Sequence, residues 1–167
     1  MDFTATSSQD QLFAAARRGE VPALQAALAA GAPVDAANDK GFTALILACY
    51  DNHPEAARFL LDAGANPNRQ DIAGNTALMG VSFKGYVEIA RLLVERGASL
   101  NLQNSTGSTA LIYSTMFGHH DLLRLLVNAG ADKDIKDSRG LTALHVASQQ
   151  GNATALALLG GTPPTTA

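Results

Sequence analysis

Cysteine and charge are both scarce in this sequence. The single cysteine, Cys49, cannot form an internal disulfide, which excludes a disulfide-stapled scaffold and is compatible with a reducing compartment. Charged residues make up only 16% of the chain, and 12 basic against 15 acidic side chains give a net charge of -3. A duplex-binding surface needs clustered positive charge to displace counterions, and this chain has neither the sign nor the clustering. We therefore expect no nucleic-acid partner.

Apolar segments long enough to span a membrane are also missing. Hydrophobic residues nevertheless make up 47% of the chain, which is enough to form a buried core. A charged residue or asparagine interrupts every helix-length window, so no stretch approaches the roughly 20 residues that span a bilayer. The segment Met1 to Thr6 has no basic residues followed by an apolar run, so no uncleaved secretory signal is expected. We expect a soluble, cytoplasmic protein without a membrane partner, or a periplasmic one if a signal peptide has been removed.

The sequence is rich in repetition at a period of 33 residues. Four copies of the phrase Gly-x-Thr-Ala-Leu follow one another at this spacing, and a second phrase, Gly-Ala, keeps the same step after each Leu-rich helical stretch. Two motifs in register indicate a stack of equivalent units that share one core. The first phrase begins at Gly41, Gly74, Gly107 and Gly140, and the second at Gly31, Gly64, Gly97 and Gly130.

These phrases resemble the ankyrin repeat family, whose period is about 33 residues, with a Gly-x-Thr-Pro-Leu-His start and a Leu-Leu-x-x-Gly-Ala-x-x-Asn end. The resemblance covers nearly the whole chain and is to a small, single-domain protein of the bacterial type. It implies an all-α solenoid of about five helix-turn-helix repeats with short β-turn or hairpin fingers. Alanine replaces the family's proline in all four phrases, which suits the first turn of a helix. Only His145 keeps the family's histidine, where we expect it to bond within the turn network.

The repeat domain is predicted to span residues 8–159. Its first unit lacks the Gly-x-Thr phrase and has Asp10 where threonine would cap the first helix, so we expect an N-terminal capping repeat. The last unit breaks off at Gly160-Gly161 and is expected to be the C-terminal cap, because end repeats have one face in water. A disordered N-terminal segment is predicted for residues 1–7 and a flexible tail for 160–167. The predicted repeats are about 8–37, 38–70, 71–103, 104–136 and 137–159.

Helix boundaries follow from residue types that recur at the same register. The threonine of each phrase is placed to cap the first helix of its repeat with its hydroxyl. A glycine between the two helices ends the first one in a left-handed conformation, and Asn52 takes that place in the second repeat. The threonines are Thr43, Thr76, Thr109 and Thr142, and the glycines are Gly85, Gly118 and Gly151.

Motifs for catalysis and metal binding are missing. The sequence has no nucleophile elbow, phosphate loop, dinucleotide fingerprint or paired metal-binding cysteines. Cys49 lies four residues before His53, but a structural metal site needs four ligands and only two are in view. The adjacent pair His119-His120 is a second candidate for a metal site. However, His119 shares its register with His53 and Tyr86, which favours a structural role. We expect neither an enzyme nor a metal site.

The end of each first helix carries the residues that we expect to bind a partner. In proteins that resemble this one, this register lines the concave face. Large apolar side chains in a groove mark a binding site, with basic residues at the rim to steer acidic groups. The alternative is that these side chains fold down onto their neighbours and thicken the core. The predicted set is Arg17, Arg18, Phe42, Tyr50, Asp51, Phe83, Lys84, Met116 and Phe117, with Tyr50, Phe83, Met116 and Phe117 as the apolar anchors.

Two functions are open at this point. The first is that of a monomeric, non-catalytic module that binds a partner protein or peptide in its groove and needs no cofactor. The second rests on the resemblance to small bacterial ankyrin proteins, some of which support catalases, and it predicts haem binding or haem delivery. Tyr50 is then the candidate ligand of ferric haem, since catalases themselves use tyrosine. Tyr113 is a weaker candidate because its register is normally a core leucine.

Overall fold

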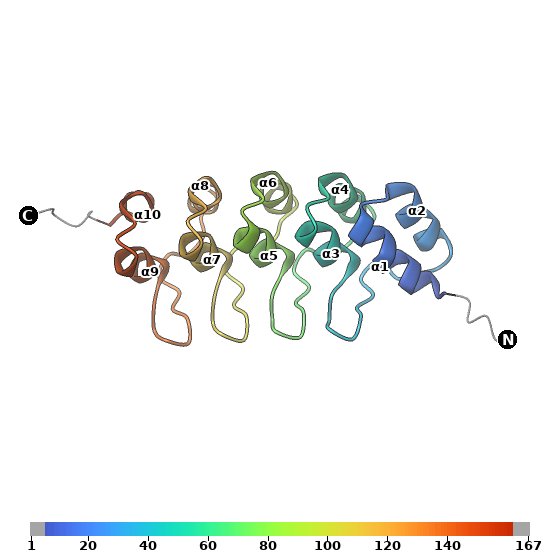
Figure 1. Cartoon of the computed structure of the whole chain (residues 1–167), viewed down its shortest axis with the longest axis horizontal. Helices are drawn as coiled ribbons and strands as arrows, with labels where there is room; N and C mark the ends of the chain where they lie inside the picture. Colours follow the sequence, from blue (N-terminus) through green and yellow to red (C-terminus); the bar gives the residue numbers. More distant parts are fainter. Residues whose placement is uncertain (1–5, 162–167) are drawn as a thin grey trace, which may run out of the picture.

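The computed structural model describes residues 6–161, and this part of the chain is a stack of ten helices in five antiparallel pairs (Figure 1). The first helices of the pairs form one row, the second helices form another, and long finger loops extend from the first row. Within these residues the β structure is limited to one isolated bridge between Ala37 and Thr43. The predicted all-α solenoid of five helix pairs is confirmed. The helices are α1 (Ser8–Arg18), α2 (Val21–Ala29), α3 (Ala44–Tyr50), α4 (Pro54–Asp62), α5 (Ala77–Lys84), α6 (Val87–Glu95), α7 (Ala110–Met116), α8 (His120–Asn128), α9 (Ala143–Gln149) and α10 (Ala153–Leu159).

The terminal segments are described only in part. The first helix begins at Ser8 and the last ends at Leu159, with Gly160 as its cap. Residues 1–5 of the predicted N-terminal segment and 162–167 of the predicted tail lie outside the described residues.

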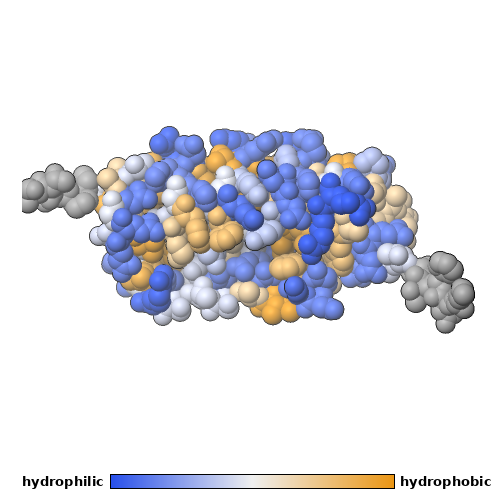
Figure 2. Space-filling view, viewed as in Figure 1, coloured by the Kyte–Doolittle hydropathy of each residue, from blue (hydrophilic) through white to orange (hydrophobic). Residues whose placement is uncertain are grey.

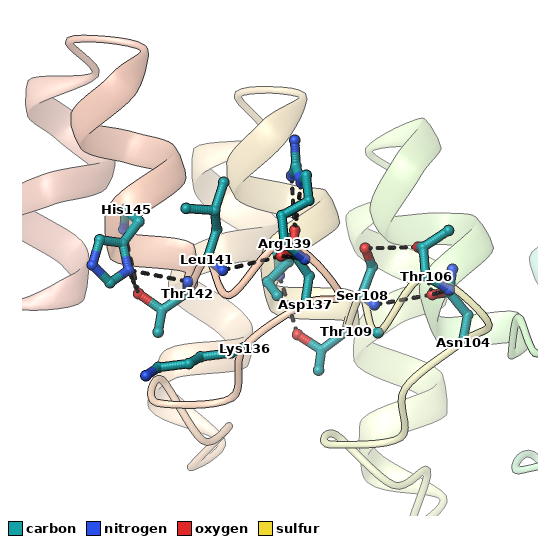
Figure 3. A network of polar contacts seen from close by, with 12 residues as sticks. Asn104, Thr106, Ser108, Thr109, Lys136, Asp137, Arg139, Leu141, Thr142 and His145 are labelled. Atoms are coloured by element: carbon teal, nitrogen blue, oxygen red, sulfur yellow. Dashed lines mark hydrogen bonds and ion pairs between the residues drawn. The ribbon is translucent and has the colours of Figure 1, made fainter.

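Threonine hydroxyls cap the first helices of the last four repeats, as predicted. In α3, α5, α7 and α9 the hydroxyl of the capping threonine accepts a hydrogen bond from the backbone N–H three residues later, over 3.2–3.3 Å. In the last repeat His145 adds the reciprocal bond, because its Nδ1 accepts from the backbone N–H of Thr142 (Figure 3). The expected role of His145 within the turn is therefore confirmed.

The cap predicted for the first repeat was wrong. Ser7, not Asp10, caps α1, and its hydroxyl oxygen accepts from the backbone N–H of Asp10 at 3.0 Å. The Asp10 carboxylate instead accepts a hydrogen bond from the Ser7 hydroxyl at 2.7 Å. The helix starts about one turn earlier than the register of Thr43 suggests.

A residue in the left-handed backbone conformation separates the two helices of each pair. At Gly19 and Gly85 a histidine ring of the next repeat packs beside that residue. Asn52, with φ of 62°, is the one non-glycine residue with positive φ in the described part of the chain, as its register predicted. A Cβ at Gly85 would lie 2.6 Å from the His119 ring, so glycine is required there for space as well as for its φ of 82°. His119 Nε2 bonds the carbonyl of Phe83 at 2.9 Å, and His53 does the same to Arg17 at 2.8 Å. Both histidines therefore tie adjacent repeats together, which confirms their structural role.

The core lies between the two rows of helices and runs the length of the stack. Leu93 and Leu126, at matching positions in α6 and α8, are completely buried. Leu78 and Leu111, at matching positions in α5 and α7, are almost completely buried as well. The two helices of each repeat pack on each other and on the helices of the adjacent repeats, so the stack is stabilised by nearest-neighbour interfaces.

The fingers are held by a side-chain motif that recurs every 33 residues. In each finger an Asn or Asp Oδ1 accepts from the backbone N–H four residues later, and in three of the four also from the N–H two residues later. Such Asx turns fix the loop without a strand. Figure 3 shows two of them side by side. The residues are Asn38, Asp71, Asn104 and Asp137.

Neighbouring fingers are also joined to one another. The backbone N–H of Ile72 donates to the Lys40 carbonyl at 3.1 Å, and equivalent bonds of 2.9 Å link the next two pairs of fingers. The amide of Gln70 donates both to its own finger, at Gly74, and to the next one, at Gln103. The fingers therefore form one connected rim along the first-helix row.

Candidate functional site: the groove of the first helices

A pocket of about 470 Å³ opens between the ends of α3 and α5 and the finger loops. Its walls come from four repeats that the 33-residue period places side by side. The first-helix surface around it, together with the finger rim, is called the groove below. Figure 2 shows apolar surface gathered over the middle of the first-helix row, with polar surface around it. The pocket is lined by Arg17, Phe42, Ile46, Leu47, Tyr50, Asp51, Asp71, Asn75, Thr76, Met79, Gly80, Phe83 and Tyr113.

The pocket has its depth because a side chain is missing at Gly80. The equivalent positions of the other four first helices are Ala14, Leu47, Tyr113 and Val146. A Cβ at Gly80 would lie 3.5 Å from Cδ2 of Tyr50 and would meet nothing else within 4 Å. Gly80 therefore leaves open space beside the Tyr50 ring where every sister repeat has an apolar side chain.

Aromatic rings form the wall on the C-terminal side of the pocket. Phe83 and Tyr113 line the pocket there, with their ring centroids 6.4 Å apart. Phe117 does not line the pocket but packs edge to face on Phe83, with the centroids 4.6 Å apart. The Tyr113 hydroxyl accepts a hydrogen bond of 2.9 Å from the Asn104 side chain, which holds the ring against the finger. Tyr113 is thus half-buried and lines the pocket rather than lying in the core, contrary to its expected register.

The predicted anchors differ in how much surface they offer. Tyr50 and Phe117 are each 44% exposed and Phe83 is 38% exposed. Met116 is half-buried and does not line the pocket, and its carbonyl accepts from the Gln150 amide of the next repeat. Phe42 is half-buried at the finger side of the pocket.

Only some of the charged residues predicted to bind a partner line the pocket. Arg17 and Asp51 line the pocket, whereas Arg18 pairs with Glu20 at 2.9 Å and lies outside it. The hydrogen bond from Arg18 lowers the pKa of the Glu20 carboxyl. The Lys84 ammonium lies 4.6 Å from the centroid of the Tyr50 ring, a cation–π contact on one of the pocket walls.

Comparison with known protein families gives the architecture a name. The family model described as ankyrin repeats, in three copies, matches residues 12–104 and again 78–165. The chain belongs to the ankyrin repeat family. No curated protein matches it as a relative. Ankyrin repeats are generally protein–protein interaction modules and generally non-catalytic.

Other parts of this ankyrin repeat chain offer little chemistry. Among residues 6–161 no group of three or more His, Cys, Asp or Glu side chains is placed to hold a metal ion. No helix of this region has the length and apolarity to cross a membrane. Cys49 is fully buried, and burial raises the pKa of its thiol, which keeps it in the unreactive protonated form.

Two features of the ankyrin groove were missed from the sequence, although both left a signal. Gly80 stands out as glycine within a helix, at a register where the other four repeats have Ala, Leu, Tyr and Val. The Asx residues of the fingers recur every 33 residues as Asn or Asp. Both patterns become visible only when the repeats are aligned column by column.

Proposed function

We propose that this ankyrin repeat protein is a non-catalytic binding module that holds a segment of a partner protein in its groove. The observation that carries the proposal is the exposed aromatic surface formed by Tyr50, Phe83 and Phe117 around an apolar pocket. Large aromatic side chains left in contact with water typically mark interaction sites and supply the anchors of an interface.

The connected finger rim supports this function because it makes the groove rigid before binding. Hydrogen bonds between adjacent fingers and the Gln70 and Gln103 bridges fix the loops in the free protein. A pre-ordered surface loses little conformational entropy on association, so more of the contact energy appears as affinity. Arg17 at the pocket would add attraction for acidic groups of the partner.

The test is a selection of short random peptides displayed on phage against the full chain, followed by titration of the selected peptides. Truncation of Phe117 or Tyr50 to alanine should weaken their binding at least about tenfold, as expected for aromatic anchors. Arg124→Ala, on the exposed second-helix face, is the matched control and should leave the affinity unchanged. Binding that survives both groove substitutions would refute the groove as the binding surface.

A second candidate function, haem binding, has one specific observation in its favour. Tyr50, a phenol suited to ferric haem, and Arg17, a partner for a propionate, line the same apolar pocket. The donor set therefore fits the group in chemistry, and bound haem would supply redox or oxygen chemistry or serve as cargo. Ferric haem should then give a new absorbance band with the wild type that is lost in Tyr50→Phe, which removes only the hydroxyl. An unchanged spectrum in Tyr50→Phe would exclude Tyr50 as the ligand.

A further inference from the structure

The C-terminal end of the stack exposes positions that the preceding first helices bury. Leu144 in α9 is 38% exposed, whereas the leucines at the same register of α3, α5 and α7 are 1% exposed. His145 and Ser148 are exposed too, although their counterparts in the same three helices are at most 8% exposed. Each of those helices packs against the first helix that follows it, and in the described part of the chain α9 has none after it (Figure 1). The exposed positions are therefore one half of a repeat interface. The buried counterparts are Leu45, Leu78 and Leu111, then Ile46, Met79 and Ile112, then Cys49, Ser82 and Thr115.

The last finger has no neighbouring finger on its C-terminal side either. A Cβ at Gly41, Gly74 or Gly107 would lie 2.8–2.9 Å from the backbone of the following finger, whereas one at Gly140 would meet nothing within 4 Å. The carbonyl that accepts from the next finger in those repeats is here that of Arg139, and among residues 6–161 no backbone N–H donates to it. The surface formed by Leu144, His145, Ser148 and this finger is called the end face below.

The charges around the end face balance. No Asp, Glu, Lys or Arg occurs from Leu141 onward, whereas α8 in the preceding repeat carries Asp121 and Arg124. In the turn and finger before Leu141, three acidic and three basic residues cancel between positions 132 and 139, and exposed Asp134 and Lys136 lie two residues apart. Apolar positions beside charges of both signs can match a copy of themselves, because each acidic group can meet the basic group of the other copy.

The N-terminal end of the stack is a poorer match for the end face. A head-to-tail stack would place α1 of a second copy where a later first helix lies in the same chain. At the register of Gln11, the other four first helices have alanines that are at most 2% exposed. Head-to-tail stacking would therefore bury the long polar side chain of Gln11 in a place that elsewhere holds only a methyl group, which is unfavourable. The alanines are Ala44, Ala77, Ala110 and Ala143.

We propose that the end face is a dimerisation surface, at which the end face of a second copy takes the place of a following repeat. The contact is symmetric, with the two Leu144 side chains at its centre and the last fingers beside them. It departs from the monomer expected from the sequence. Neither α9 nor α10 contributes to the pocket of the groove, so a dimer leaves both grooves open. The inference does not depend on the proposed function.

The first experiment is sedimentation velocity of the full chain over a series from micromolar to near-millimolar concentration. The mass should rise from that of one chain towards that of two and no further. Leu144→Glu places like charges in an apolar contact and should weaken dimerisation at least about tenfold. Ile72→Glu replaces another exposed apolar residue, at a finger tip of the third repeat, and should dimerise as the wild type does. Circular dichroism checks that both variants are folded.

Ser148 provides a second test that leaves the fold intact, because its side chain is exposed in the single chain. Ser148→Glu and Ser148→Lys should each dimerise at least about tenfold more weakly than the wild type, since identical charges meet in a symmetric contact. An equimolar mixture of the two variants should recover the dimer, because opposite charges then face each other. This recovery requires both chains to use the same face.

Several outcomes would overturn the proposal. These are a wild type that stays monomeric throughout the series, dimers that persist in both Leu144→Glu and Ser148→Glu, and a mixture of the Ser148 variants that stays monomeric. Growth beyond two chains would indicate head-to-tail stacking and would also overturn it.

The segment 162–167 is the other candidate occupant of the end face. Gly161 lies against Leu144, since a Cβ there would be 2.6 Å from the leucine Cδ1. A chain that is monomeric with residues 162–167 and dimeric without them would show that this segment covers the end face, which overturns the dimer of the full chain. A chain that dimerises equally well with and without them supports the proposal.

Discussion

Substitution of Gly80 by alanine should stabilise the fold. Glycine in a helix interior is about 0.5–1 kcal/mol less favourable than alanine, because its unfolded backbone has more freedom to lose. The new Cβ would lie 3.5 Å from Tyr50 Cδ2, which is an ordinary van der Waals contact, and would meet no other atom within 4 Å. Nothing in the structure opposes the helix-propensity gain, so we expect the free energy of unfolding to rise by about 0.5–1 kcal/mol.

The assay is urea unfolding followed by helical circular dichroism, together with the melting temperature, which should rise by about 1–4 °C for a chain of this length. The same change five residues later is the contrast. Gly85→Ala should destabilise by at least about 1–2 kcal/mol, since φ is positive there and the new methyl group would meet the His119 ring at 2.6 Å. A Gly80→Ala protein that is less stable than wild type would refute this account of the position. A gain in stability with a loss of peptide binding would show that glycine is kept at a cost to the fold.

Further predictions concern the core, one finger and the thiol. Truncation of Leu93 or Leu126 to alanine should lower the free energy of unfolding by about 2–5 kcal/mol in urea titrations, and a loss below roughly 1 kcal/mol would contradict their place in the core. Burial of Asp137 raises the pKa of its carboxyl, but hydrogen bonds from Arg139 and from the backbone outweigh it and hold the pKa below the usual value. Its stabilising contribution is therefore present above about pH 4 and lost as the pH falls through the lowered pKa, so the acid loss of stability should be smaller in Asp137→Asn. Cys49 should react with a thiol reagent at mildly alkaline pH only after unfolding, and rapid reaction of the native protein would show that the core opens.

The sequence predicts most of the scaffold because each structural residue recurs in several repeats. The capping threonines could be predicted from four copies of one phrase, and Asn52 from its alignment with three glycines. The cap of the first helix could not, because that helix starts at Ser8, outside the register that the other first helices share. Repetition predicts what the repeats have in common and fails where one repeat differs.

The groove was predictable as a row of positions but not as a shape. The 33-residue register brings Tyr50 and Phe83 to one surface. It does not show that Met116 is half-buried outside the pocket or that Tyr113 lines the pocket instead of lying in the core. Both depend on how neighbouring side chains pack in three dimensions rather than on spacing along the chain.

The hydrogen bonds that join the fingers use the backbone and the side chains of Gln70, Gln103 and Asn104. Among the tips, the Arg139 side chain also pairs with Asp137 of its own finger. Ile72 is 77% exposed at such a tip, yet its structural bond is made by its N–H group. Exposed tip positions such as Ile72 can therefore be varied without disturbing the turns that hold them. The rim provides a template for engineered recognition, in which such tip positions are randomised as a library while the bridging and turn residues are kept constant: Asn38, Gln70, Asp71, Gln103, Asn104, Asp137 and Arg139.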